Sequence, residues 1–361
     1  MIKSIKKLEE QIERFNIDYY IQEKNYGVAA ALSALDATNE IQKAYFASPI
    51  ITDRSESILR LYALLQGLFV SVDSLYSLAF EITKNKNFIN INQNEDLRTL
   101  KYIRNDVVGH PANRVLNKTD LSYCMLDTIN ISNDIFYYDI YTKDGIDRRA
   151  VNVRALVNSF YTVADNFFDE IYKIAEGEHN AKKIEKIAKK LISQFEMNDD
   201  YLDTLEALIV EYKKEYPSAT KANHRVIWKY ETIKELLEIS PKNIYETDFI
   251  NHCIGCEIIK IFEYITNGTY MPNIRKALPK YVSNTYRFLK KNRYLQTRIN
   301  YLSDTAHPLF ETALNQLLRE AQRINNESVI EYFSLILEYY HANSLDVVYS
   351  FVKPLKDFEG K

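Results

Sequence analysis

The sequence predicts a mainly α-helical protein that carries one small antiparallel β-ribbon. Glycine and proline, which interrupt regular structure, number only eight each among 361 residues. Apolar residues recur at intervals of three and four along most of the chain, the spacing that places them on one face of a helix. The segment 128–151 departs from this period, because β-branched and aromatic residues there form short runs around a turn signal.

Two long helices near the N-terminus are expected to form an antiparallel pair. Small apolar residues define one face of a helix over residues 26–47, which Pro49 ends. Asp53 or Ser55 can cap the next helix, which continues to about residue 83 and carries a continuous apolar stripe. The short connection between the two helices indicates that they pack side by side.

A third helix is expected to follow a polar loop and to end abruptly. Asn94 can cap it, and acidic residues occupy its first turn, where the helix dipole favours negative charge. The helix continues through Val108, and Leu97, Leu100, Ile103 and Val107 form its buried stripe. Gly109 suits a left-handed helix stop, and Pro111 cannot continue a helix.

The β-ribbon is expected to contain two or three antiparallel strands. Residues 128–131 and 135–141 have strand composition, 143–145 form a turn signal, and 149–151 can return as a third strand. A helix from 152 to 176 follows it. No function for the ribbon follows from its residues.

The polar residues after Gly177 predict a domain boundary, with a first domain over 1–177 and an α-helical second domain over 178–361. No repeat period is visible. The remaining expected helices cover 2–16, 180–195, 199–215, 221–238, 246–266, 273–294, 308–324 and 327–350.

Charge and cysteine content exclude several classes of protein. The net charge of −3 provides no global basic field, so any nucleic-acid binding must come from a local patch. Three cysteines form no disulfide framework, and the Cys253-x-x-Cys256 pair lacks the two further ligands that zinc needs. Buried thiols are the favoured interpretation, and no metal or cofactor is expected. No signal peptide and no run of 18 apolar residues is found, which predicts a cytoplasmic protein without membrane contact.

The end of the third helix carries the clearest chemical motif, Arg104-Asn105-x-x-x-x-His110. An arginine can grip a phosphate with a planar fork of donors. A histidine at a helix C-terminus is a tunable acid or base, and an asparagine can orient either group. These three side chains are sufficient for RNA cleavage without a metal.

This motif resembles that of the HEPN superfamily (higher eukaryotes and prokaryotes nucleotide-binding), in which Arg, a polar residue and His stand at the end of a helix after a long helix pair. The resemblance covers about residues 24–115, and extends to 176 if the helix after the ribbon completes the bundle. It implies a homodimer in which two motifs form one composite cleft. It also implies metal-independent endoribonuclease activity, with Arg104, Asn105 and His110 in the site, often in toxin–antitoxin or phage-defence systems with an antitoxin partner.

Two alternatives remain open at this point. Arg104 and His110 can instead satisfy helix-end carbonyls and a neighbouring carboxylate. A HEPN-like fold can also serve as a binding or scaffolding module without turnover.

Charged residues near the motif have two interpretations each. Arg98, Lys101 and Arg114 can extend phosphate contacts or form a solvated surface. Asp73 and Glu81 on the preceding helix can orient His110, although exposure to solvent is the favoured interpretation.

A second basic stretch, residues 274–300, contains no acidic residue. Its basic groups interleave with tyrosines and a phenylalanine, as in surfaces that bind single-stranded RNA. The same pattern fits an amphipathic helix with aromatics inside and charges in water, which is the favoured interpretation. The RNA-contact candidates in it are Arg287, Lys290, Lys291 and Arg293.

Overall fold

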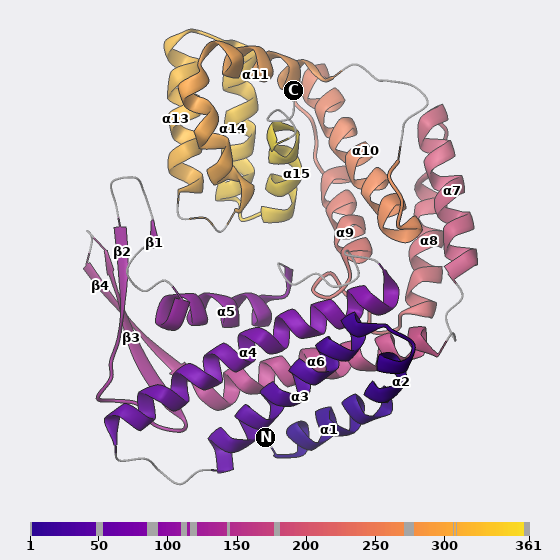
Figure 1. The fold of residues 1–361 in the computed structure, drawn as a ribbon. Helices are drawn as coiled ribbons and strands as arrows, with labels where there is room; N and C mark the ends of the chain where they lie inside the picture. The colour runs from indigo at the N-terminus through magenta and orange to yellow at the C-terminus, as the bar shows by residue number, and fades with distance from the viewer. Residues whose placement is uncertain are drawn as a thin grey trace. The chain divides into compact units, whose positions relative to one another are not determined.

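The computed structural model is mainly α-helical with one small antiparallel sheet, as the sequence predicts (Figure 1). It describes residues 2–47, 53–84, 93–109, 114–115, 121–142, 145–176, 181–270, 278–305, 307 and 309–356. The chain divides into two compact units. The first contains Met1–Ala181 and Glu211–Arg225, and the second contains Lys182–Val210 and Val226–Lys361. The expected boundary after Gly177 lies outside the described residues.

The described part of the first unit is built around a long antiparallel pair of helices. Gly27 of α3 lies against Glu81 of α4, and Ile41 lies against Gly67, so the two helices run in opposite directions. Between them Ser71 donates a buried hydrogen bond of 2.7 Å to Thr38. The helices are α1 (Ile2–Arg14), α2 (Ile17–Gln22), α3 (Tyr26–Ala47), α4 (Arg54–Thr83), α5 (Glu95–Arg104) and α6 (Val153–Ala175).

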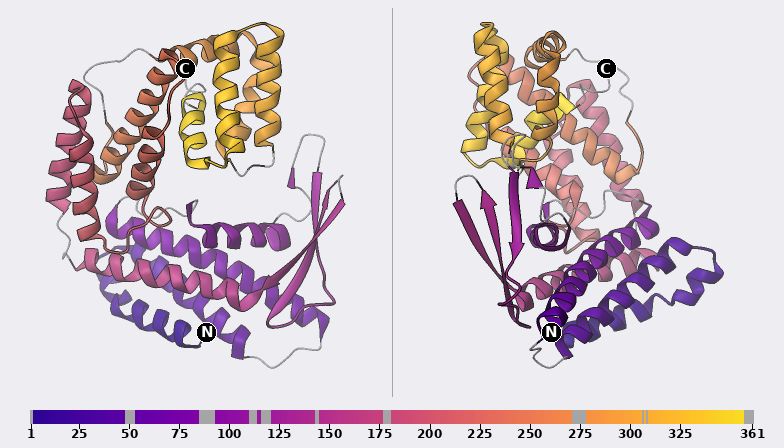
Figure 2. Two further views of the ribbon diagram at one scale, coloured as in Figure 1. Left: turned by 180° about the vertical axis from the view of Figure 1, so that it is seen from behind. Right: turned by 60° about the vertical axis from the view of Figure 1, so that its left-hand side comes forward.

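The sheet lies at the end where α4 and α6 begin (Figures 1 and 2). Its strands are β1 (Arg114–Val115), β2 (Leu121–Leu126), β3 (Ile135–Thr142) and β4 (Gly145–Asn152), all antiparallel in the order β1-β2-β3-β4. Cys124, Phe136, Tyr138 and Val151 are buried on its inner face.

The predicted strand over 128–131 is wrong. The strand that pairs with β3 lies earlier, at Leu121–Leu126. The Asp127 carboxylate accepts hydrogen bonds from the backbone N–H groups of Ile129 and Asn130, both 3.2 Å long. This local side-chain turn competes with strand pairing and bends the chain.

The second unit contains the remaining helices, and two of its predicted elements need correction. The helix expected over 327–350 is interrupted after His341, where Asn343 has a φ of +59°. The helix expected over 273–294 begins only at Lys280, after Pro279. The helices are α7 (Ala181–Met197), α8 (Leu202–Glu215, shared with the first unit), α9 (Arg225–Leu237), α10 (Ile244–Thr266), α11 (Lys280–Lys291), α12 (Gln296–Ile299), α13 (Phe310–Arg323), α14 (Glu327–His341) and α15 (Leu345–Lys356).

Within the described part of the chain, α4 alone is long and apolar enough to cross a membrane by length and composition. Half of its most apolar window is buried inside the protein. A core helix of a folded unit meets the same criteria, so α4 is weak evidence for a membrane span.

Candidate functional site

The motif begins where α5 changes from an α-helix to a π-helical turn. Asn94 caps α5, since its side chain accepts a hydrogen bond of 3.0 Å from the Leu97 N–H. After Arg104 the chain continues as a π-helical turn over Asn105–Gly109. Such turns insert a residue into the helical repeat, redirect the side chains around it and occur frequently at functional sites.

Arg104 is held on three sides by residues of α4 and of its own turn. Its Nε and Nη2 donate to Oε1 of Gln66, at 3.1 and 3.0 Å. Its Nη1 donates to Oδ1 of Asn105, at 3.0 Å. The guanidinium carbon lies 4.5 Å from the centre of the Phe69 ring, within the range of a cation–π contact. The half-buried guanidinium therefore has a fixed plane and orientation.

Gly109 closes the turn against Arg104, and its predicted left-handed conformation is wrong. Gly145, not Gly109, is the glycine with positive φ among the described residues. A Cβ at position 109 would come within 2.6 Å of Arg104 Nη1 and 3.3 Å of Asn105 Oδ1. Glycine leaves room here for the Arg104 side chain, which lies directly on the backbone.

Asp106 attaches the same turn to the sheet. Its side chain is buried, and its Oδ2 accepts a hydrogen bond of 3.3 Å from the Tyr138 hydroxyl on β3. Burial raises the pKa of Tyr138, and the negative charge of Asp106 raises it further. Tyr138 therefore stays a neutral hydrogen-bond donor at physiological pH. Through this bond, strand β3 supports the turn.

His110, the third residue of the motif, lies outside the described residues, as does Pro111. The structure therefore describes the motif only as far as Gly109.

The other charged residues near the motif separate into two groups. Lys101 and Asp73 are exposed, and Arg98 is half-buried. Partial desolvation raises the pKa of Asp73, whereas Lys101 and Arg104 act to lower it, so these charges lie near one another. Glu81 lies apart from them, against Gly27 of α3, and forms an ion pair of 2.6 Å with Lys84. For Arg114 the structure defines the backbone, in β1.

The second basic stretch forms an amphipathic surface in the second unit. Tyr281 and Phe288 are buried, and Tyr294 is 62% exposed. Arg287, Lys290, Lys291 and Arg293 are all exposed. This arrangement matches the amphipathic interpretation, because two of the interleaved aromatics belong to the core.

The Cys-x-x-Cys pair lies in the middle of α10. Cys253 is buried and its Sγ donates to the Ser350 carbonyl at 3.8 Å. Cys256 is half-buried, with its Sγ 3.7 Å from His252 Nε2. No group of three or more potential metal ligands occurs within the described ranges.

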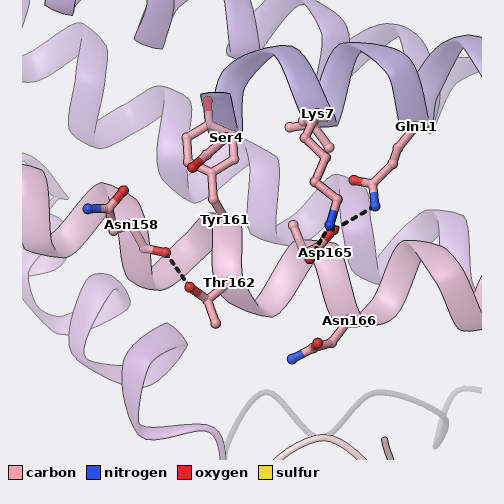
Figure 3. A pocket seen from close by; sticks show the side chains of 10 residues that line it. Ser4, Lys7, Gln11, Asn158, Tyr161, Thr162, Asp165 and Asn166 are labelled. Carbon is pink, nitrogen blue, oxygen red and sulfur yellow. Dashed lines mark hydrogen bonds and ion pairs between the residues drawn. The ribbon is translucent and has the colours of Figure 1, made fainter. Parts of the chain in front are cut away.

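A pocket of about 210 Å³ lies between α1 and α6, away from the motif residues (Figure 3). Amide and hydroxyl groups line most of it, including those of Ser4, Asn158 and Thr162. Its one carboxylate, Asp165, already accepts from Lys7 at 2.6 Å and from Gln11 at 2.9 Å (Figure 3). The pocket therefore presents neutral polar groups to a ligand, because its carboxylate is already paired with Lys7.

No family model, no curated protein and no solved structure matches the chain. The function has to be argued from the residues of the site.

Three residues of the site were missed by sequence reasoning: Gln66, Phe69 and Tyr138. Gln66 and Asp73 interrupt an otherwise apolar helix and lie two turns apart on one face, with Phe69 between them. Polar residues at this spacing in an apolar helix were the available signal. Nothing in the sequence indicates the pairing of Tyr138 with Asp106.

Proposed function

We propose that this protein is a metal-independent endoribonuclease of the HEPN type. The observation that carries the proposal is Arg104, a preorganised guanidinium held by neutral partners at the start of the motif. Preorganised cationic donors stabilise the charge that develops in a transition state without further reorganisation. The helix pair, the following helix and the motif at its end agree with the HEPN resemblance.

The proposed reaction is attack of a ribose 2′-OH on the adjacent phosphorus, which breaks the bond to the 5′-oxygen. The 2′-OH proton passes to a base, and an acid protonates the leaving 5′-oxygen. His110 supplies one of these functions, and His110 of a second copy supplies the other in a dimeric cleft. Arg104 binds the non-bridging phosphate oxygens, and Asn105 holds Arg104 in place.

The proposed setting is a cytoplasmic toxin or phage-defence effector that acts as a homodimer, with RNA as substrate and an antitoxin or regulator as partner. In this proposal the second unit senses, regulates or binds substrate. The runner-up is a HEPN-like module that binds nucleic acid or protein without turnover.

The test compares wild type with His110→Ala and Arg104→Ala on total RNA and tRNA in EDTA. We expect wild type to leave 2′,3′-cyclic phosphate ends and each variant to lose at least about 100-fold in rate, as removal of one transition-state donor typically does. Light scattering should show a dimer for all three proteins. Folded dimers that do not cleave RNA would favour the binding module instead.

A further inference from the structure

We propose that Gln66 is a positioning residue for Arg104, and that its neutral amide reserves the guanidinium charge for an anionic ligand. The inference deepens the proposed function and rests on it in one respect, because that function makes the ligand an RNA phosphate. Gln66 belongs to α4 and is 38 residues away from Arg104 in the sequence.

Gln66 fixes one edge of the guanidinium. A single oxygen, Oε1, accepts from both Nε and Nη2, which sets the rotation of the guanidinium in its own plane. Phe69, one turn further along α4, lies under the face of the guanidinium and sets the tilt of that plane. Both contacts come from α4, whose buried positions pack against α3 and α6 and hold the helix in place.

The N–H groups of Arg104 that are not used by Gln66 and Asn105 can bind a ligand. A guanidinium has five N–H groups, and three of those of Arg104 donate to Gln66 and Asn105. One N–H is left on each terminal nitrogen. These two N–H groups can donate to two oxygens of a phosphate.

No described carboxylate is paired directly with Arg104, and Asp73, whose pKa Arg104 acts to lower, lies further away than an ion pair. In the part of the chain that the structure describes, no carboxylate oxygen lies within 4.0 Å of this guanidinium. Some other arginines of the same unit have such a partner: Arg60 pairs with Glu56 and Arg154 with Asp134, both at 2.5 Å. A glutamate at position 66 would accept the same two hydrogen bonds, but it would neutralise the cation before a phosphate arrives.

The experiment compares wild type, Gln66→Leu, Gln66→Glu and Ser77→Glu as full-length proteins. Ser77 is exposed on the same face of α4, eleven residues or about 16 Å along the helix, so its variant adds an equal charge beyond the screening length. Binding is measured by fluorescence anisotropy with a labelled single-stranded DNA oligonucleotide, which has no 2′-OH and cannot undergo the proposed cleavage. RNA cleavage, the salt dependence of binding and the melting temperature are measured in parallel.

We expect Gln66→Glu to be at least as stable as wild type, yet to bind the DNA about tenfold more weakly and to cleave RNA at least tenfold more slowly. The slope of log Kd against log salt should fall by about 0.7, the value for one lost phosphate contact on a single strand. Gln66→Leu should lower kcat more than it raises KM, because Arg104 keeps its charge but loses its orientation. Ser77→Glu should stay within twofold of wild type.

The outcomes separate the two proposals. If Gln66→Glu binds and cleaves like Ser77→Glu, the positioning role is wrong. Losses that merely follow a lowered melting temperature would assign Gln66 a structural role and overturn the inference as well. If wild type binds DNA with the expected pattern of variants but never cleaves RNA, the nuclease proposal fails and the role of Gln66 stands.

Discussion

Gly109→Ala should lower the activity of the site strongly while leaving the protein folded. The added Cβ would come within 2.6 Å of Arg104 Nη1, about 0.8 Å short of an ordinary contact of 3.4 Å. The obstructed atom is the end of a flexible side chain, so Arg104 moves and the backbone does not. Alanine is favoured over glycine in a helix by about 1 kcal/mol, which offsets part of the lost hydrogen bonding.

The expected size of the effect follows from this displacement. A misplacement of about 1 Å can lower an enzymatic rate about 100-fold, so a shift of about 0.8 Å predicts a loss of about 40-fold in kcat/KM. The melting temperature should stay within about 4 °C of wild type, since about 1 kcal/mol corresponds to about 2–4 °C at this size.

The matched control is Gly67→Ala, on the helix that contacts Arg104. A Cβ there would meet Ile41 at 3.4 Å, an ordinary contact, and would not touch the motif. RNA cleavage and thermal unfolding of both variants are measured together. Equal activity of Gly109→Ala and Gly67→Ala would refute the argument that Arg104 packs directly on this glycine.

Three further predictions concern buried polar pairs. Tyr138→Phe should lower RNA cleavage about tenfold, because Asp106 loses its phenol donor and the motif turn loosens. The control Tyr161→Phe removes a comparable buried hydrogen bond, of 2.6 Å to Asn39. It should lower the free energy of unfolding by about 1 kcal/mol and leave the activity unchanged. Equal effects of the two variants on activity would contradict this role of the sheet. In the second unit Lys229→Met should cost about 3–5 kcal/mol in urea unfolding, because it leaves Glu257, 2.7 Å from the amine, buried without its partner. Desolvation acts to raise the pKa of Glu257, but Lys229 and Lys353 lower it below its usual 4.5, so stability is present above that pH and lost as pH falls further. Glu257→Gln should remove this acid dependence, and an unchanged pH profile would show that another group causes it.

Helices with a continuous apolar period were the part of the fold that sequence reasoning predicted best. The helix expected over 26–47 has the bounds Tyr26–Ala47 in the structure, because a regular apolar face and Pro49 define it locally. The expected strand at 128–131 failed for an equally local reason. Its β-branched residues favour a strand, but the preceding Asp127 hydrogen-bonds the backbone into a bend.

The sequence predicts the chemical groups of the candidate site but not the residues that hold them in place. Arg104 and Asn105 were identified from residue type and spacing within ten residues of chain. Gln66 reaches Arg104 from 38 residues away, and Tyr138 reaches Asp106 from 32 residues away, through helix crossing and strand register that no local pattern specifies. The π-helical turn over Asn105–Gly109, with Asp106 buried in it, likewise follows from no local pattern.

The bond between Tyr138 and Asp106 also has a consequence for the order of synthesis. Asp106 leaves the ribosome 32 residues before Tyr138, a delay of roughly 2–6 s at 5–20 residues per second. The motif turn therefore lacks its support until strand β3 has emerged and paired. If the protein cleaves RNA as proposed, the site of a nascent chain would therefore be less active during that interval than the site of the finished protein.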